Sequence, residues 1–201
     1  GRLKFLDIVD KITIHQVDIT DYASVVRLLN FIKPNRIYNL AAQSFVQDSF
    51  DNPMVTSLIN FDAVTNMLEA IRVFGIDTKF YQASTSEMFG QVLRDPQDEN
   101  TPFNPMSPYA VSKCAAHYLV KNYRIAYGME CVSGILFNHE SELRGREFVT
   151  RKITSGLARI ANGDTQPIKL GNCDSKRDWG YAPDYVDAMQ AIIEDGKNTD
   201  Y

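Results

Sequence analysis

The most constraining feature of the sequence is a regular alternation of segments with strand character and segments with helical periodicity. We predict strands at 12–19, 36–42, 79–85, 129–138 and 167–171, and helices at 21–32, 52–75, 107–128, 148–162 and 183–195. This alternation is typical of an α/β protein with a doubly wound parallel sheet, because each parallel crossover needs a helix. The 201 residues suffice for one sizeable core but not for two large domains.

Residues that favour helix ends support these boundaries. Ser107 is expected to cap the third predicted helix, and Gly128 is a typical residue after its last turn. Thr20 is the expected N-cap of the first helix, and Gly75 is expected to end the second. The helical segments are therefore predicted from their ends as well as from their periodicity.

One part of a nucleotide-binding sheet is missing from the sequence. A Rossmann-type site needs a glycine-rich turn after its first strand, and no such turn occurs here. We therefore expect a Rossmann-like doubly wound sheet that lacks its first βα unit, in a chain that is the middle, or an incomplete copy, of a longer protein. Residues 1–138 are predicted to be a partial dinucleotide-binding domain. Residues 139–201 are predicted to be a mixed segment that ends this domain and forms part of a smaller C-terminal substrate-binding region.

Composition and charge exclude several classes of function. The formal net charge is −4, and no basic stripe indicates nucleic-acid binding. No apolar run approaches the ~18–20 residues of a membrane span, and the N-terminus shows no secretory leader. The three cysteines lack a C-x-x-C pattern and the three histidines are scattered. We therefore expect reduced thiols, a cytoplasmic location and no metal site.

Polar side chains follow the predicted strands at the point where each strand ends. Asp18 lies at the end of the first strand, and "AAQS" at 41–44 follows the second. "STSE" at 84–87 and "NHE" at 138–140 lie at the ends of the next two. Because ligands bind at the carboxyl ends of parallel strands, these segments predict a ligand site at one edge of the sheet.

Tyr109 and Lys113 are four residues apart at the start of a predicted helix, so they share one face. A lysine beside a phenol stabilises the phenolate, so we expect the pKa of Tyr109 to be lowered from about 10. Together with Thr85 at a strand end, they make up a hydride-transfer site in which the tyrosine exchanges a proton with an alcohol. The same spacing also occurs on solvated helices, so a surface pair is the alternative from these residues alone.

Six stretches carry a resemblance to a known family. They are "IYNLAAQS" (37–44), "FYQASTSEMFG" (80–90), "TPFNPMSPYAVSK" (101–113), "GILFNHES" (134–141), "RGREFVTRKIT" (144–154) and "LGNCDSKRDWGYAPDYV" (170–186). On these motifs the chain resembles the nucleotide-sugar branch of the extended short-chain dehydrogenases/reductases. Within that branch it is similar to the GDP-mannose 4,6-dehydratases over nearly its whole length, and "NHES" followed by "FVTRKI" is the most specific part.

The resemblance implies a lyase that converts GDP-mannose to GDP-4-dehydro-6-deoxy-mannose and water with bound NADP. It implies that Thr85, Tyr109 and Lys113 serve the oxidation at C4. It also implies that Glu87 removes the C5 proton and then protonates the departing C6 hydroxyl, after which the hydride returns to C6. From the sequence alone, Glu87 could instead cap a nearby helix or bind solvent.

The resemblance also assigns binding residues. Cofactor contacts are expected at Asp18, Ile19, Leu40, Ala41, Ala42, Gln43, Ser44, Tyr109, Lys113, His139 and Arg144. Substrate contacts are expected at Ser86, Glu87, Asn138, Lys152 and Arg177. Phe45, Val55 and Leu143 depart from residues common in the family, which bears on cofactor affinity but leaves the four catalytic positions unchanged.

The resemblance implies a homodimer or homotetramer joined by the helices over 52–75 and 108–127. Two alternative functions stay open at this point. One is another nucleotide-sugar decarboxylase or epimerase of the same family. The other is a catalytically silent binding module, which the missing glycine turn favours and the intact set of four catalytic residues opposes.

Overall fold

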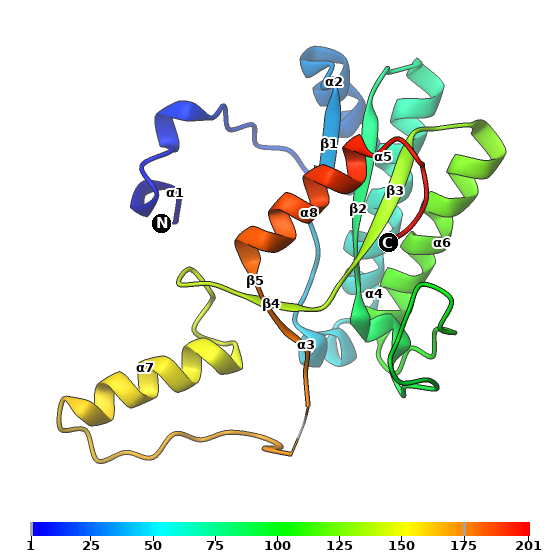
Figure 1. Ribbon diagram of the computed structural model, residues 1–201. Helices are drawn as coiled ribbons and strands as arrows, with labels where there is room; N and C mark the ends of the chain where they lie inside the picture. Colours follow the sequence, from blue (N-terminus) through cyan, green and yellow to red (C-terminus); the bar gives the residue numbers. More distant parts are fainter. Residues whose placement is uncertain (1, 175) are drawn as a thin grey trace. The chain divides into compact units, whose positions relative to one another are not determined.

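The computed structural model describes residues 2–174 and 176–201. The chain forms two compact units (Figure 1). The larger consists of His15–Leu136 and Ala188–Tyr201, and the smaller consists of Gly1–Ile14 and Phe137–Asp187. The chain therefore leaves the larger unit after Leu136 and returns to it at Ala188. The division at residue 138 into a dinucleotide-binding domain and a mixed segment stays a prediction.

The larger unit is built on a parallel sheet of three strands in the order β1-β2-β3. The strands are β1 (Arg36–Asn39), β2 (Lys79–Thr85) and β3 (Cys131–Leu136). Tyr38 lies beside Tyr81 in the first pair, and Ala83 lies beside Gly134 in the second. Helices connect the strands, as the parallel pairing requires, so the predicted Rossmann-like α/β fold is confirmed.

Three helices of the larger unit share one hydrophobic core with the sheet. They are α2 (Tyr22–Ile32), α5 (Ala63–Phe74) and α6 (Pro108–Tyr127). Leu29, Leu68 and Val120, one from each helix, pack in a buried cluster with Phe80 of β2. Every residue of β2 except Lys79 is buried, so a site at the end of this central strand lies on a well-packed part of the sheet.

The helix predicted over 52–75 is divided in the structure. It consists of α4 (Pro53–Ser57), a π-helical turn η2 (Leu58–Asp62) and α5, and it is preceded by the unpredicted helix α3 (Val46–Asp51). Gly75 ends α5 at φ +58°, as predicted, because glycine adopts this left-handed conformation readily. The buried side chain of Asn60 lies in this π turn and accepts a hydrogen bond from the N–H of Gln43, in the segment that follows β1.

The helix caps agree with the sequence in one case and differ in another. The Ser107 hydroxyl accepts a hydrogen bond from the N–H of Ala110, and Gly128 follows α6 at φ +66°, as predicted. The prediction for Thr20 was wrong, because Asp21 is the N-cap of α2. The carboxylate of Asp21 accepts hydrogen bonds from the N–H groups of Ala23 and Ser24 in the first turn. The hydroxyl of Thr20 instead donates to Asp18.

Two predicted strands are not strands in the structure. Residues 12–19 form no strand and pair with no described strand, and Ile12 and Ile14 are exposed. An apolar run becomes a strand only where a neighbour completes its hydrogen-bond ladder. Residues 167–171 also form no strand, because Ile168 packs on Gly156 of a helix instead. The strands predicted over 36–42 and 129–138 are shorter than expected.

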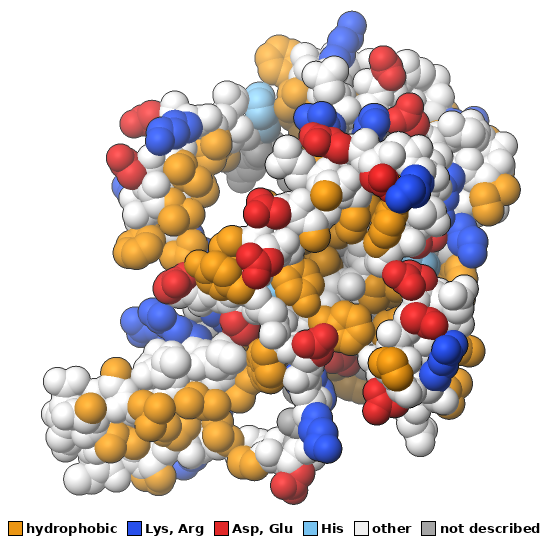
Figure 2. Space-filling view, in the orientation of Figure 1, with side chains coloured by type: hydrophobic (Ala, Val, Ile, Leu, Met, Phe, Trp, Pro, Cys, Tyr) orange, Lys and Arg blue, Asp and Glu red, His pale blue; other side chains and the backbone are white. Residues whose placement is uncertain are grey.

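The smaller unit contains a two-stranded parallel sheet of β4 (Asn138–Glu140) and β5 (Trp179–Tyr181). Its helices are α1 (Arg2–Phe5), a single turn η1 (Val9–Lys11) and α7 (Val149–Ala161). Helix α8 (Ala182–Glu194) begins in this unit and continues into the larger one. Exposed apolar side chains lie along α7, and the surface there is rich in hydrophobic atoms (Figure 2). Among the described helices, none has the length and apolar content to cross a membrane.

Candidate active site

The four residues predicted to be catalytic all lie in the larger unit. Thr85 is the last residue of β2, and Glu87 lies in the 3-10 turn η3 (Ser86–Phe89) directly after it. Tyr109 and Lys113 lie in the first turns of α6. Thr85, Tyr109 and Lys113 are at most 9% exposed, so the pair on α6 is not a solvated surface pair.

Thr85 shapes the end of β2. Its hydroxyl oxygen accepts a hydrogen bond of 3.3 Å from the N–H of Glu87 and so caps η3. Glu87 itself is half-buried, and no hydrogen bond or ion pair from the described residues reaches its carboxylate. The helix cap is therefore made by the threonine, and the carboxylate of Glu87 is left available for a ligand.

The phenol of Tyr109 has a raised pKa, contrary to the lowering expected from Lys113. Burial is the largest cause, the charge of Glu87 adds to it, and the hydrogen bond with Thr85 acts in the opposite direction. The ammonium of Lys113 donates to the backbone carbonyl of Ala83, and burial lowers the pKa of Lys113 to about 8. Hydroxyl, phenol and ammonium groups thus meet at the carboxyl end of β2.

A buried polar chain that sequence analysis missed supports this strand end. Asn39 at the end of β1 donates to Gln82 at 2.8 Å, and Gln82 donates to the carbonyl of Ala83 at 3.0 Å. Asn39 also accepts from the N–H of Ala41 at 3.2 Å, which links the chain to the segment after β1. The amide side chains at the buried end of β1 and within buried β2 were the signal that could have revealed it.

Asn60 is a second residue that sequence analysis missed. Its side-chain amide accepts from the N–H of Gln43 at 2.9 Å and donates to the carbonyl of Gln43 at 3.1 Å. It also lies 3.2 Å from the hydroxyl of Ser112 on α6. Asn60 lies in the π-helical turn η2, and its two hydrogen bonds to Gln43 hold the backbone of the segment 40–44.

The other cofactor residues predicted in the larger unit lie along surface segments. Leu40, Ala41 and Ser44 are exposed after β1, while Ala42 and Gln43 are half-buried. Asp18 is exposed, and hydrogen bonds from Thr20 lower the pKa of its carboxyl. Ile19 packs on the core, and Ser86 is half-buried beside Glu87.

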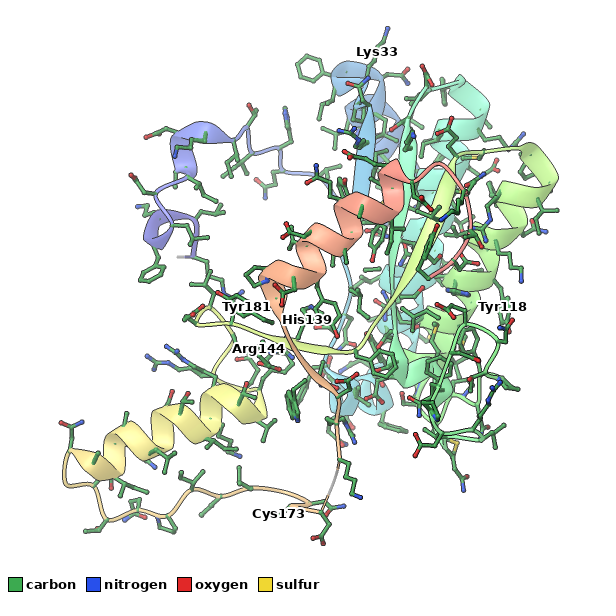
Figure 3. All side chains as sticks on the ribbon, viewed as in Figure 1. Lys33, Tyr118, His139, Arg144, Cys173 and Tyr181 are labelled. Atoms are coloured by element: carbon green, nitrogen blue, oxygen red, sulfur yellow. The ribbon has the colours of Figure 1, made fainter. Side chains whose placement is uncertain are left out.

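The remaining predicted residues lie in the smaller unit. His139 of β4, labelled in Figure 3, stacks on Tyr185 at 4.8 Å. Its Nδ1 contacts the carbonyl of Phe137 at 2.9 Å. Arg144 is 3.2 Å from Glu140 and lies over the ring of Phe148. Asn138 is half-buried in β4, whereas Lys152 and Arg177 are exposed.

Arg144 also borders an open cavity of about 510 Å³ in the smaller unit. Arginine dominates its lining, with two glutamates, and the charged residues are Arg2, Arg144, Arg146, Arg151, Glu142 and Glu147. The cavity therefore has a net positive lining. In the part of the chain that the structure describes, no group of three or more His, Cys, Asp and Glu could hold a metal ion.

A parallel sheet flanked by helices, with a threonine at a central strand end and a Tyr-x-x-x-Lys pair on the next helix, defines a short-chain dehydrogenase/reductase fold. The model of the family described as GDP-mannose 4,6 dehydratase matches residues 3–201. The chain belongs to this family.

Curated relatives agree with this assignment. The chain is 48% identical over 193 residues to GDP-mannose 4,6 dehydratase of Drosophila melanogaster, covering 95% of this chain and 49% of that protein. It is 50% identical over 192 residues to GDP-mannose 4,6 dehydratase 2 of Arabidopsis thaliana, covering 94% of this chain and 51% of that protein. The chain thus spans about half the length of the curated relatives it matches.

Solved structures show the same fold. The structure of RMD from Pseudomonas aeruginosa complexed with NADPH matches 98% of this chain and 72% of its own, with a TM-score of 0.86 and 25% identity. UDP-glucose 4-epimerase of Thermus thermophilus in complex with NAD matches 92% of this chain and 61% of its own, with a TM-score of 0.79 and 26% identity. Both neighbours are complexed with a nicotinamide dinucleotide, and the second is named as a UDP-glucose 4-epimerase.

Proposed function

We propose that the complete protein is an NADP-dependent lyase that converts GDP-mannose to GDP-4-dehydro-6-deoxy-mannose and water. The observation that carries this proposal is the meeting of Thr85, Tyr109 and Lys113 at the end of β2, with Glu87 next to them. Membership of the GDP-mannose 4,6-dehydratase family supports the choice of substrate.

The residues present fit a nicotinamide cofactor. Leu40, Ala41 and Ala42 follow β1 with small or exposed side chains, and Asn60 holds the backbone beside them. A relative of similar fold is complexed with NADPH, which supports NADP as the cofactor. When bound, NADP supplies a hydride acceptor for C4 of the sugar and returns the hydride at C6.

Tyr109, Thr85 and Lys113 are proposed to handle the proton of the C4 hydroxyl. The phenolic oxygen of Tyr109 takes that proton, while the hydroxyl of Thr85 hydrogen-bonds the same sugar oxygen. Tyr109 is protonated in the protein alone, because burial raises the pKa of its phenol, so it must lose its own proton before it takes that of the C4 hydroxyl. Burial lowers the pKa of Lys113 to about 8, so its neutral amine is accessible near neutral pH and is proposed to accept the phenol proton.

Glu87 is proposed to remove the C5 proton, which becomes acidic once C4 is a ketone. The same carboxyl then delivers a proton to the departing C6 hydroxyl, so one group serves as base and then as acid. Its half-buried position, with no hydrogen bond or ion pair from the described residues, leaves the carboxylate available for both steps. Oxidation alone needs no carboxylate at this place.

Binding roles in the two units are also proposals. Asp18, Ile19 and the segment 40–44 are proposed to contact the cofactor in the larger unit, as are His139 and Arg144 in the smaller one. Ser86, Asn138, Lys152 and Arg177 are proposed to contact the substrate. Exposed cations such as Lys152 and Arg177 suit a diphosphate, because they can pair with it at little desolvation cost.

Self-association of the complete protein is proposed through the helices of residues 53–74 and 108–127. The support is a set of exposed apolar side chains on these helices, Met54, Val55, Leu58, Val111 and Tyr118. Analytical ultracentrifugation at micromolar concentration tests this, and a single species of monomer mass contradicts it.

The test of function is mass spectrometry of nucleotide sugars after incubation with the complete protein and NADP. The panel contains GDP-mannose, UDP-glucuronate, UDP-glucose and CDP-glucose. Loss of one water from GDP-mannose alone, abolished by Glu87→Gln, is the expected result. Loss of carbon dioxide from UDP-glucuronate instead would identify a decarboxylase, and turnover of no sugar would favour a binding module.

A further inference from the structure

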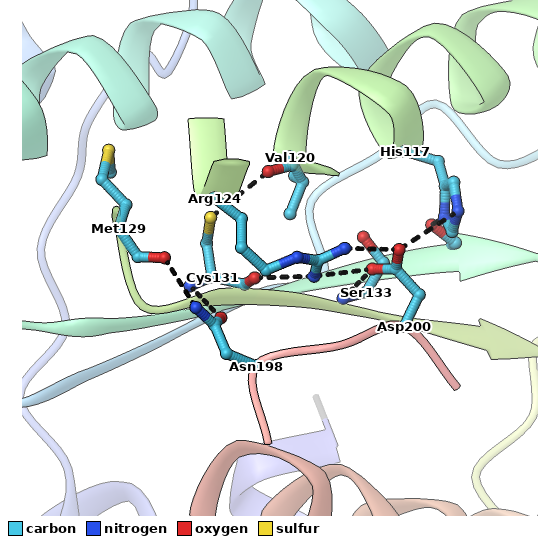
Figure 4. Close-up of polar contacts among 9 residues, drawn as sticks. His117, Val120, Arg124, Met129, Cys131, Ser133, Asn198 and Asp200 are labelled. Atoms are coloured by element: carbon cyan, nitrogen blue, oxygen red, sulfur yellow. Dashed lines mark hydrogen bonds and ion pairs between the residues drawn. The ribbon is translucent and has the colours of Figure 1, made fainter. Parts of the chain in front are cut away.

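A buried polar cluster lies behind the end of β2, and none of the proposed roles uses it. We call Ser84, His117, Arg124 and Asp200 the His117 cluster. Figure 4 labels His117, Arg124 and Asp200. Ser84 and His117 are 3% and 5% exposed. The side chains of Arg124 and Asp200 are 9% and 14% exposed. A cluster this deeply buried must satisfy its hydrogen bonds internally.

The contacts of the cluster favour one tautomer of the imidazole. Nδ1 of His117 is 3.0 Å from the hydroxyl of Ser84, and Nε2 is 3.9 Å from a carboxylate oxygen of Asp200. Because the carboxylate favours a proton on Nε2, we assign Nδ1 as the acceptor and Ser84 as the donor. The histidine therefore orients the serine hydroxyl.

Asp200 is itself held from two elements. Arg124 of α6 donates to both carboxylate oxygens, at 2.9 and 2.6 Å, and the N–H of Ser133 in β3 donates at 3.2 Å. The charge that faces Nε2 thus cannot turn away without breaking three hydrogen bonds. The Arg124–Asp200 ion pair therefore holds one side of the cluster in place. The hydroxyl of Ser84, on the other side, belongs to the residue before Thr85 of the proposed site.

The packing around His117 is aromatic. Its ring meets Phe103 edge-on at 5.2 Å and Tyr118 at 5.9 Å. Burial lowers the pKa of His117, as do the charges of Arg124 and Lys121, and Asp200 acts in the opposite direction. The imidazole is therefore neutral near pH 7, and its hydrogen bond to Ser84 lies in a surrounding of low polarity where such bonds are strong.

The position of His117 on α6 connects the cluster to the proposed site. Tyr109, Lys113 and His117 follow one another at intervals of four residues, so they share one face of the helix. Thr85 acts on the phenol of Tyr109 and lowers its pKa, Lys113 donates to Ala83, and His117 contacts Ser84 between them. Three successive turns of α6 thus hold three consecutive residues of β2.

We propose that His117 is a positioning residue, whose bond to Ser84 fixes the end of β2 so that Thr85 stays in hydrogen-bond contact with Tyr109. Without this bond Lys113 still holds Ala83, but the contact of α6 with the residue next to Thr85 is lost. The proposal rests on the proposed function, since it assigns His117 a part in positioning the residues of that site.

The kinetic test compares variants of the complete protein with GDP-mannose and NADP. Ser84→Ala and His117→Phe are each expected to lower kcat about tenfold and to leave KM within about twofold. The double variant is expected to lose no more than the worse single variant, because both substitutions break the same contact. His117→Asn, whose amide lies near the place of Nδ1, is expected to keep most of the rate. Tyr127→Phe, at the exposed far end of α6, is the control that should keep all of it.

Two kinetic outcomes would overturn the proposal. One is an unchanged kcat in either single variant, which would leave the contact without any effect on the site. The other is a double variant in which the two losses multiply to about a hundredfold, because independent effects add in free energy.

A second readout does not depend on turnover. In NMR spectra of the protein with isotope-labelled tyrosine, the Tyr109 signal is identified by its loss in Tyr109→Phe. This signal is expected to move by the same amount in Ser84→Ala, His117→Phe and the double variant. If the wild type does not dehydrate GDP-mannose, the proposed function fails, and this signal alone decides the role of His117. A Tyr109 signal that stays in place in both single variants refutes positioning.

Discussion

The ammonium of Lys113 donates a hydrogen bond to the backbone carbonyl of Ala83, two residues before Thr85 in β2. The same carbonyl accepts from Gln82 at 3.0 Å, and Gln82 is in turn bonded to Asn39. The lysine is therefore held by a neutral strand backbone inside the larger unit. Burial lowers its pKa to about 8, which makes its charge sensitive to the range of pH in which many enzymes work.

Lys113→Met is expected to remove a pH dependence of stability between about pH 8 and pH 10.5. The folded-state pKa is about 8 against an ordinary value of 10.5, so the unfolded chain binds more protons in this window. The titration of Lys113 therefore adds stability as the pH rises, on the order of 3 kcal/mol across the window, and Lys113→Met lacks this contribution. Urea unfolding across the window measures this, and the exposed Lys121→Met is the matched control. Equal slopes for wild type and Lys113→Met would contradict the prediction.

Glu69→Gln is expected to destabilise the protein above about pH 4.5 and to have a vanishing effect as the pH falls towards 2. Hydrogen bonds from Arg72 and Tyr123 lower the pKa of Glu69 to about 2, so its contribution is lost only when the folded-state carboxylate is protonated. The side chain is 28% exposed, and we expect a screened effect of about 1 kcal/mol. Urea unfolding at several pH values checks this, and the exposed Glu130→Gln should have little effect at any of them.

Gly90→Ala is expected to destabilise the protein by roughly 3 kcal/mol or more. Gly90 follows η3 at φ +52°, and a Cβ built there would lie 1.8 Å from the carbonyl oxygen of Asn104. Gly75→Ala is the matched control, since Gly75 has φ +58° and open space around it, and only about 1 kcal/mol is expected. Thermal unfolding of both variants is the measurement. A loss at Gly90 no larger than that at Gly75 would mean that the backbone there moves freely away from Asn104.

Asn60→Ala is expected to lower the free energy of unfolding by about 2 kcal/mol and to weaken NADPH binding by about tenfold. The substitution leaves the N–H and the carbonyl of Gln43 without their partner, and the segment 40–44 loses its support. Urea unfolding and fluorescence titration with NADPH measure the two effects. Asn30→Ala, which removes one exposed side-chain bond on α2, should change neither. Normal NADPH affinity in Asn60→Ala would separate this loop from the cofactor.

Much of the larger unit could be predicted from local sequence. β2 is a short apolar segment that ends in hydroxyl residues, and α6 has its cap at Ser107 and its stop at Gly128, so both elements were confirmed. The identities of Thr85, Tyr109 and Lys113 and their places on a strand end and a helix start follow from the same local signals. Their roles stay predictions until the variants are measured.

The predictions that failed depend on distant neighbours. Residues 12–19 have the alternation of a strand, yet a strand also needs a partner, and none of the described strands pairs with them. The pKa of Tyr109 was expected to fall, because the sequence places a lysine one turn away. In the fold that lysine is directed to Ala83, and burial raises the pKa instead.

The sequence by itself determined the principal strands β1, β2 and β3 of the larger unit, the ends of α6 and the set of reactive side chains, because periodicity, caps and spacing are local properties. Only the tertiary structure decided which segments pair as strands, which charged groups are buried and which buried polar groups find hydrogen-bond partners. Asn39, Asn60 and His117 are ordinary polar residues until Gln82, Gln43 and Ser84 are brought within hydrogen-bond distance. Burial then gives these contacts their strength, and burial is a property of the whole fold.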